Sequence, residues 1–418
     1  MTMLSQQQRI FFEFLRFCIG TVQEVPSSLK GADWRVLYAM ARKQCLVGVL
    51  FDGIKRLPAD VGMDKGLLFQ WMAQNQTLRK TNARLDKAAV EVAEWFGRKG
   101  FRTCVLKGQG NALLYPSGME RTPGDIDIWV EGGDKRVISF VRSISPHEKA
   151  CYHHIEFPSY KGVEVEVHYR PSFLLCFWHN RKLQKYYERV KEEQFSHRVM
   201  LGAKGEIAIP TVEFNLIFQL THIFSHLMNE GIGLRQLLDY FFLLKNTNFS
   251  GNTDGGAFLS STDNTDKIGG NVDGDGFLLN TDFTDNTDRI GGNADGDAFL
   301  VNTNLTDRRL LQDELRRLGL WKFAGAVMYI MKEVFGLEDN LLIAPLDVKR
   351  GRFVLNEVLE AGNFGKHDAR NRFGRSQFGH NLQRVYRDIR LVRYFPAEAL
   401  SEPIFRTWHF FWRCYQKM

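Results

Sequence analysis

The sequence predicts an α+β protein in which a small mixed sheet is flanked by helical segments on both sides along the chain. Apolar residues recur at three- and four-residue spacing before residue 100 and after Pro210, which is typical of amphipathic helices. Between these regions lie three short β-branched, aromatic or alternating runs, as expected of strands: FRTCVLKG, DIDIWV and GVEVEVHYR. A chain of 418 residues is long enough for more than one domain.

Residues 1–99 form the predicted N-terminal helical region. Its last helical run ends at Gly100, and glycine commonly follows a helix because it adopts the left-handed conformation without steric cost. Pro and Gly separate the three runs that carry helical spacing, which are Gln6–Val22, Asp33–Arg56 and Lys65–Lys99.

The three strand-like runs place the predicted α+β core at residues 100–200. Residues 201–245 read as a helical segment packed on that core, and residues 305–418 as a C-terminal helical region. The C-terminal region contains a loop rich in Gly, Arg and His (360–380) and an Arg-aromatic tail. Charge combined with stacking side chains suits a nucleic acid partner, and a solvated basic face on a helical packing domain is the alternative.

Residues 246–304 differ from the rest of the chain in composition and carry a tandem repeat. The segment 264–285 recurs almost unchanged as 286–307, with a 22-residue period rich in Asn, Asp, Thr and Gly. Closely spaced Asp residues around Gly are similar to calcium-binding loops, but neither copy has the Glu that closes an EF-hand loop. The composition therefore favours a passive surface insertion over a calcium module.

Charge and cysteine usage indicate which ligands and which cellular compartment suit this protein. The insertion carries ten Asp, one Lys and one Arg, so the remainder of the chain, with 53 basic and 38 acidic residues, has a charge of +15. Such a body favours anionic ligands. The N-terminus lacks the basic start of a signal peptide, no apolar run reaches 18 residues, and six scattered cysteines have no metal-type spacing. These features predict a cytoplasmic protein without a transmembrane segment.

The DIDIWV and GVEVEVHYR runs bring carboxylates together. Residues i and i+2 of a strand face the same side, so Asp125 and Asp127 present two carboxylates together. In the second run Glu164, Glu166 and His168 share the polar face. If the two strands are neighbours, Glu166 or Glu164 completes a three-carboxylate cluster, which suits a hard cation such as Mg²⁺. A half-exposed edge strand is the alternative.

The turn at Lys107–Gly108 lies between the first strand and a helix. Glycine there permits close approach of a phosphate, and the helix N-terminus favours anions. The chain has no GxxxxGK[ST], no GxGxxG after a strand, no GxSxG and no HExxH. The sequence therefore disfavours P-loop and NAD enzymes, common hydrolases and zinc proteases.

Taken together, LKG, GDIDIWV, EVH and HLMNEGIGLRQLLDY resemble the uncharacterised bacterial nucleotidyltransferase family of the polymerase-β-like superfamily. The resemblance implies a small nucleotidyltransferase core that moves a nucleoside monophosphate from a nucleoside triphosphate to an unidentified acceptor hydroxyl. It implies Mg²⁺ or Mn²⁺ as cofactor, held by Asp125, Asp127 and Glu166 as the catalytic residues. The acceptor class, whether protein, RNA, sugar or small metabolite, stays open.

By the resemblance Gly108 is the turn glycine, and the candidate nucleotide-binding residues are Lys107, Gly108, Gln109, Arg121, His168 and Arg235. Lys107 and Arg121 are candidates because their charge neutralises phosphate, and a solvated loop position is the alternative for Arg121. Gln109 stands where the superfamily carries Gly or Ser. This difference keeps an alternative open, a non-catalytic nucleotide-binding sensor or antitoxin-like protein of the same fold. His222 and His226 have i, i+4 spacing, which favours packed histidines over a zinc site, and Arg235 and Asp239 have the spacing of a helical ion pair.

Overall fold

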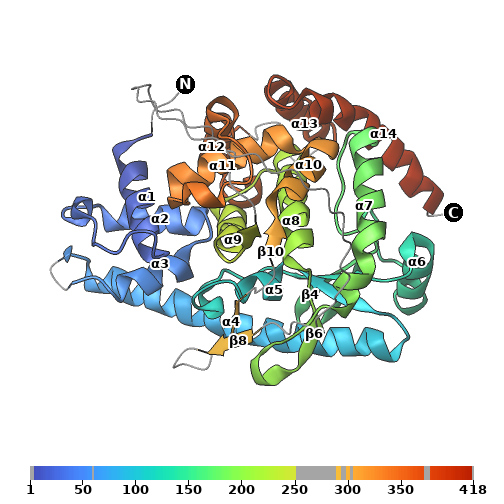
Figure 1. Ribbon diagram of the computed structural model, residues 1–418, viewed down its shortest axis with the longest axis horizontal. Helices are drawn as coiled ribbons and strands as arrows, with labels where there is room; N and C mark the ends of the chain where they lie inside the picture. The colour runs from blue at the N-terminus through green and yellow to red at the C-terminus, as the bar shows by residue number, and fades with distance from the viewer. Residues whose placement is uncertain are drawn as a thin grey trace, which may run out of the picture.

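A computed structural model of the chain describes residues 4–58, 61–250, 289–292, 298–301, 305–370 and 377–416. A small sheet lies beside the long helix α4 (Lys65–Arg98), and helices from the N-terminal region and from the second half of the chain cover the remainder (Figure 1). The described residues thus contain the predicted α+β arrangement, with a mixed sheet between helical regions.

The N-terminal region is helical as predicted, but one expected run is broken. Its shorter helices are α1 (Gln6–Cys18), α2 (Trp34–Lys43) and α3 (Val47–Ile54). The break between α2 and α3 comes at Cys45, whose φ is +56°. Gln44 beside it is buried and donates from Nε2 to the carbonyl of Val358, 3.1 Å away. Contacts to distant residues therefore interrupt a helix that local spacing alone favours. At the end of α4, Gly100 has φ +78°, as expected of a glycine after a helix.

The central sheet has four strands in the order β1-β2-β4-β3. The strands β1 and β2 are antiparallel, β2 and β4 parallel, and β4 and β3 antiparallel. Their bounds are Thr103–Leu106 for β1, Ile126–Val130 for β2, His154–Tyr160 for β3 and Val163–His168 for β4. The sequence predicted three of these strands. It missed β3, a partly exposed edge strand containing Pro158, a residue that weakens the strand signal.

The alternation in β2 places two kinds of side chain on opposite faces. Ile126 and Ile128 are fully buried in a core formed with α4 and with α6 (Gly133–Ile144). Asp127 and Trp129 point to the other face, where Trp129 joins the core of the helical regions. The sheet therefore presents polar groups of β2 to the helices of the second half of the chain.

The segment after the sheet continues into helices that bound the same face. These elements are α7 (Phe177–Ser196), the two-stranded pair β5 (Arg198–Met200) and β6 (Glu206–Ala208), and the helices α8 (Val212–Asn229) and α9 (Leu234–Lys245). Most residues of α8 and nearly all residues of α9 are buried, including polar side chains such as Gln219 and Asp239.

The predicted insertion leaves and rejoins the fold at one place. The strand β7 (Asn248–Ser250) pairs in parallel with β10 (Leu305–Asp307), so the two ends of the segment 251–304 lie side by side. Within it, β8 (Arg289–Gly292) pairs with β9 (Ala298–Val301). Most of the repeat, and with it the question of calcium binding, lies outside the described residues.

The C-terminal region consists of helices, as predicted. They are α10 (Arg308–Arg317), α11 (Trp321–Phe335), α12 (Val348–Ala361), α13 (Gln377–Val392) and α14 (Pro396–Gln416). The loop after α12 contains the short helix η6 (Asn363–Gly365). Among the described helices, none is long and apolar enough to cross a membrane.

Candidate functional site

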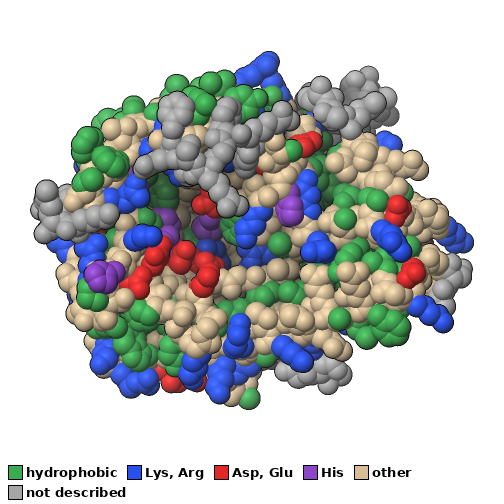
Figure 2. Space-filling view, turned by 180° about the vertical axis from the view of Figure 1, so that it is seen from behind, with side chains coloured by type: hydrophobic (Ala, Val, Ile, Leu, Met, Phe, Trp, Pro, Cys, Tyr) green, Lys and Arg blue, Asp and Glu red, His purple; other side chains and the backbone are tan. Residues whose placement is uncertain are grey.

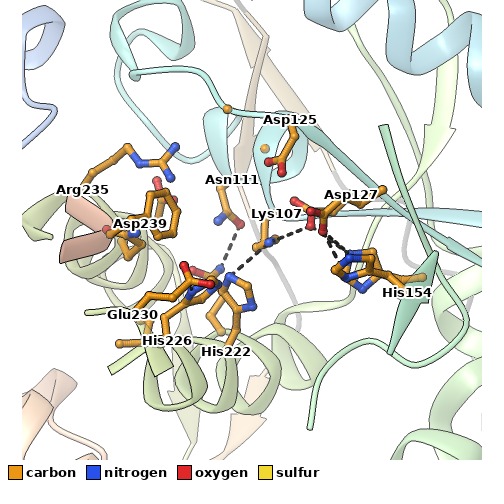
Figure 3. A pocket seen from close by; sticks show the side chains of 18 of the residues that line it. Lys107, Asn111, Asp125, Asp127, His154, His222, His226, Glu230, Arg235 and Asp239 are labelled. Atoms are coloured by element: carbon orange, nitrogen blue, oxygen red, sulfur yellow. Dashed lines mark hydrogen bonds and ion pairs between the residues drawn. The ribbon is translucent and has the colours of Figure 1, made fainter. Parts of the chain in front are cut away.

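A cavity of about 460 Å³ opens between the sheet and the helical regions. Its walls come from the turn after β1, the ends of β2, β3 and β4, the helices α8 and α9, and the loop containing η6. Acidic and histidine side chains gather in a hollow on one face of the molecule (Figure 2), and the side chains lining the cavity converge from opposite walls (Figure 3). The cavity therefore combines a sheet wall of carboxylates with a helical wall of mixed charge.

Three carboxylates meet at the sheet wall, as the sequence predicted. Asp125 immediately precedes β2, and Asp127 within β2 lies directly beside Glu166 in the parallel register with β4. One carboxylate oxygen from each of the three lies within 4.8 Å of the others. Strand alternation and the parallel pairing together produce this cluster, because each places polar residues on the same face.

Neighbouring charges shift the pKa values of the clustered carboxylates in opposite directions. The charge of Asp127, followed by burial, raises the pKa of Asp125 to about 6. Burial opposes ionisation of Asp127, but Lys107 and His168 outweigh it and hold the pKa of Asp127 well below its usual range. Lys107 Nζ lies 2.8 Å and His168 Nε2 lies 3.0 Å from Asp127 Oδ1. Three hard oxygen ligands under mutual repulsion fit a divalent cation.

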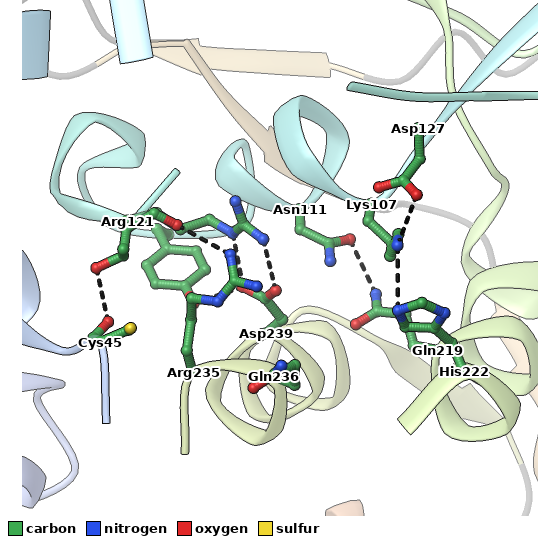
Figure 4. Close-up of polar contacts among 12 residues, drawn as sticks. Cys45, Lys107, Asn111, Arg121, Asp127, Gln219, His222, Arg235, Gln236 and Asp239 are labelled. Carbon is green, nitrogen blue, oxygen red and sulfur yellow. Dashed lines mark hydrogen bonds and ion pairs between the residues drawn. The ribbon is translucent and has the colours of Figure 1, made fainter. Parts of the chain in front are cut away.

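The turn after β1 directs Lys107 into the cavity. Lys107 has φ +51°, an uncommon conformation for a residue with a side chain, and Gly108 follows with φ +34°. The Lys107 ammonium also donates to His222 Nε2, 3.1 Å away on α8. Burial and then the charge of Lys107 hold the pKa of His222 well below its usual range, so its neutral ring accepts this hydrogen bond. Lys107 thus joins the sheet wall to the helical wall (Figure 4).

Gln109 does not lie where the predicted phosphate contact requires. It belongs to α5 (Gly108–Ala112), a helix of only five residues, and its side chain is buried outside the cavity lining. Its Oε1 atom has no hydrogen-bond partner among the described residues. Gly108 does line the cavity, so the two neighbouring residues are separated by the turn of the backbone.

Arg121 and Arg235 both line the cavity, but they differ in their hydrogen-bond and ion-pair partners. Arg121 forms a bidentate ion pair with Asp239, through Nε at 2.8 Å and Nη2 at 2.7 Å (Figure 4). The spacing on α9 had favoured an Arg235–Asp239 pair, but Asp239 instead holds the more distant Arg121. Arg235 donates from Nη1 to the carbonyl of Thr122 at 3.2 Å, and within the described part of the chain its buried Nε has no hydrogen-bond partner.

His168 lies at the junction of the carboxylates. Burial disfavours its charged form, yet hydrogen bonds to Asp127 and Glu166 raise the pKa of His168 to about 9. His226 on α8 faces His222 with ring centroids 4.3 Å apart and lies 3.6 Å from Glu230. The two i, i+4 histidines therefore lie against each other in the cavity wall.

Sequence reasoning missed several residues that line the cavity, among them His153, His154, Phe364 and Lys366. His153 immediately precedes β3, and His154 is the first residue of that strand, which the sequence pattern did not predict. Phe364 and Lys366 belong to the Gly-, Arg- and His-rich loop, which the sequence had connected with nucleic acid. The local concentration of histidine and of loop glycines was the only signal for these four positions.

The comparisons with known proteins bear on this geometry. Residues 30–265, more than half of the chain, match the model of a family described as "Uncharacterised nucleotidyltransferase". The chain belongs to this family. The match contains Lys107, the three carboxylates and the helices α8 and α9, so the cavity of this nucleotidyltransferase family member lies almost entirely within the matched region.

Two further comparisons add little to the family assignment. A solved structure described as an antigenic nucleotidyltransferase-like protein from Paracoccidioides brasiliensis is similar at 15% identity, over 40% of this chain and 78% of that chain. At a TM-score of 0.26 this likeness carries no weight for fold or function. None of the curated proteins matches the chain.

Proposed function

We propose that this member of the family is a divalent-metal-dependent nucleotidyltransferase that moves a nucleoside monophosphate from a nucleoside triphosphate to an acceptor hydroxyl. The observation that carries the proposal is the meeting of Asp125, Asp127 and Glu166 within 4.8 Å, at the wall of a cavity of about 460 Å³. That volume lies within the range of pockets that bind small molecules. Placement in the polymerase-β-like superfamily is part of the proposal.

The metal fits the donor set on this chain. Asp125, Asp127 and Glu166 offer only carboxylate oxygens, which suit Mg²⁺ or Mn²⁺, and the raised pKa of Asp125 reflects repulsion that a cation relieves. Bound there, the metal supplies charge neutralisation at the phosphates and acidifies the acceptor hydroxyl. Lys107 contacts Asp127 in the protein alone and is placed to exchange that contact for a phosphate oxygen.

The opposite wall supplies positive charge for the remainder of the nucleotide. The buried Nε of Arg235 finds no partner in the ranges that the structure describes, and Lys366 lines the same cavity. Phe364 presents its ring beside His226 at 5.1 Å and beneath the Arg235 guanidinium at 5.7 Å, an aromatic surface that suits a base or sugar. Arg121 has its charge compensated by Asp239, so in this proposal it positions the wall rather than grips phosphate.

The reaction follows from this arrangement. The acceptor oxygen forms a bond to the α-phosphorus while the bond from that phosphorus to the bridging oxygen of the β-phosphate breaks. Pyrophosphate leaves, and the hydroxyl proton passes to solvent. The carboxylates hold the metal on the sheet side, and Lys107 and Arg235 orient the phosphates from two sides, which lowers the entropic cost of reaching the reactive geometry.

The test uses each of the four nucleoside triphosphates, labelled at the α-phosphate, with Mg²⁺ or Mn²⁺ and an extract as the source of acceptors. Wild type is compared with Asp125→Asn and with Asp313→Asn, a matched carboxylate change at an exposed position outside the cavity. Label on a protein, RNA or small molecule with wild type and Asp313→Asn alone supports transfer and reveals the acceptor class. Equal label with Asp125→Asn contradicts the proposed metal site.

One observation favours the alternative of a non-catalytic nucleotide sensor. Gln109 is buried away from the cavity, so the residue after the turn glycine offers no side-chain contact to phosphate. Calorimetry separates the two functions. Metal-dependent binding of a nucleoside triphosphate without release of pyrophosphate, in the presence of every acceptor extract tried, supports the sensor over the transferase.

A further inference from the structure

A second group of metal-ligand atoms lies beside the carboxylate cluster, and it is built from imidazoles. His154 Nδ1 lies 3.3 Å and His168 Nε2 lies 3.4 Å from the same oxygen, Glu166 Oε2. One ligand atom from each of the three residues lies within 4.8 Å of the other two. Zinc bonds of about 2.0–2.1 Å in a tetrahedron hold neighbouring ligand atoms about 3.4 Å apart, which matches these two separations.

The pairing register of the strands, rather than the choice of side-chain rotamers, brings these residues together. His154 begins β3 and His168 ends β4, and the two residues are directly opposite each other in the antiparallel pair. Directly opposed residues project from the same face, about 5 Å apart at their Cβ atoms. Glu166, two residues before His168 on β4, shares that face. A site on paired strands is more rigid than one on loops.

The surroundings of His168 orient it as a ligand. Its Nδ1 atom lies 3.4 Å from the carbonyl oxygen of Arg170. Metal-binding histidines almost always have such a partner on the nitrogen that does not bind the metal. The other nitrogen, Nε2, lies 3.0 Å from Asp127 Oδ1 and 3.4 Å from Glu166 Oε2, and it releases its proton when a metal binds. His168 is buried, and His154 is largely shielded from solvent, so an ion held there would be only partly open to water.

We propose that His154, Glu166 and His168 hold a transition-metal ion of the Zn²⁺ class, next to the hard-cation site of the three carboxylates. Imidazole ligands favour Zn²⁺ and Co²⁺ strongly over Mg²⁺, whereas a set of carboxylates alone suits Mg²⁺. Glu166 belongs to both sets and bridges the two sites. The inference deepens the proposed function by giving its cavity two chemically distinct cations, and it rests on that function only for the hard-cation site.

The experiment titrates the metal-stripped full-length protein with Co²⁺ in excess Mg²⁺ and records the visible d–d absorption. One Co²⁺ per chain is expected, and Zn²⁺ displaces it. His154→Ala weakens Co²⁺ binding by tenfold or more, because one of three ligands is lost. His147→Ala, a change of an exposed imidazole outside the cluster, leaves the affinity unchanged. His168→Gln is compared only if circular dichroism shows it folded, because His168 is buried.

Three results would overturn the inference. The first is the absence of a saturable Co²⁺ spectrum, and the second is an affinity that His154→Ala leaves unchanged. The third is an intense thiolate charge-transfer band lost in Cys151→Ser, since Cys151 Sγ lies 3.5 Å from His153 Nδ1 and would then be a ligand of a different set. Asp125→Asn separates the two proposals, because it abolishes transfer but leaves Co²⁺ bound. A normal Co²⁺ spectrum in wild type without any nucleotide transfer supports the metal site and contradicts the transferase.

Discussion

The buried ion pair between Arg121 and Asp239 gives the sharpest test of how the core is joined to the helical wall. Both side chains are only 7% exposed. The carboxylate accepts two hydrogen bonds from Arg121, at 2.8 and 2.7 Å, and a third from the Tyr115 hydroxyl at 2.7 Å. Asp239→Ala removes all three and leaves the Arg121 guanidinium buried without a counter-ion, close to a second buried cation, Arg235.

The expected loss for Asp239→Ala is about 3–5 kcal/mol of unfolding free energy, because removing one partner of a buried pair leaves the other charge uncompensated. Equilibrium unfolding in urea, followed by tryptophan fluorescence, measures it. Asp313→Ala is the matched control. Asp313 pairs with Arg316 at 2.9 Å but is 73% exposed, so its loss should cost less than about 1 kcal/mol.

A double variant decides whether the cost comes from the stranded charge. Arg121→Met with Asp239→Leu replaces both charges by apolar groups of similar size, which is often neutral for buried pairs, so most of the lost stability should return. An Asp239→Ala cost below about 1 kcal/mol would refute the reasoning. A double variant no more stable than Asp239→Ala would refute the role of the uncompensated guanidinium.

Three other predictions concern catalysis, pH and the insertion. Asp127→Asn should lower the rate of nucleotide transfer at least about a thousandfold, because a catalytic metal contributes several kcal/mol to lowering the barrier. Kinetics with labelled nucleotide measure this rate. Transfer within tenfold of wild type would contradict the role of Asp127 as a metal ligand. Burial and then the charge of Glu402 raise the pKa of Asp388 to about 7, above its ordinary value of 3.8. The folded state then binds more protons than the unfolded state between about pH 4 and 7, so this group costs stability as pH rises through that window. Asp388→Asn should flatten that part of the pH–stability curve and stabilise the protein at pH 8 in thermal melts, and an unchanged slope would count against it. Replacing residues 251–304 by a Gly-Ser linker of about a dozen residues, the length that a parallel strand pair needs, should leave the melting temperature within a few degrees, because β7 and β10 already lie side by side. A large fall would show that the insertion stabilises the fold.

Much of the sheet wall follows from local pattern. Alternation in DIDIWV and GVEVEVHYR decides which residues share a face, so the grouping of Asp125 with Asp127 and of Glu166 with His168 was predictable. The pairing of β2 with β4 was a hypothesis in the sequence, and the register confirms it. Helix spacing likewise predicted the helical regions, and Gly100 their first boundary, because side-chain periodicity and glycine stereochemistry are local properties.

Tertiary structure decided the features that depend on residues distant in sequence. The break at Cys45 accompanies contacts of neighbouring Gln44 with residues more than 180 positions away, which helix spacing cannot register. Asp239 forms its ion pair with Arg121 rather than with Arg235. The contact between elements provides two parallel hydrogen bonds to the carboxylate, a stronger arrangement than an i, i+4 pair on one helix. Gln109 turned away from the cavity because the backbone reverses at Lys107, and no residue pattern records that dihedral angle.

The sequence by itself determined the chemical types at the site, namely three carboxylates, a lysine before a glycine, and a helical segment with two histidines. The tertiary structure alone decided which other side chains lie beside them. It set His154 opposite His168 and brought a distant loop, with Phe364 and Lys366, to the far wall of the cavity. Local periodicity fixes which way a side chain points within its own element. Only the packing of elements against one another fixes which side chains it meets.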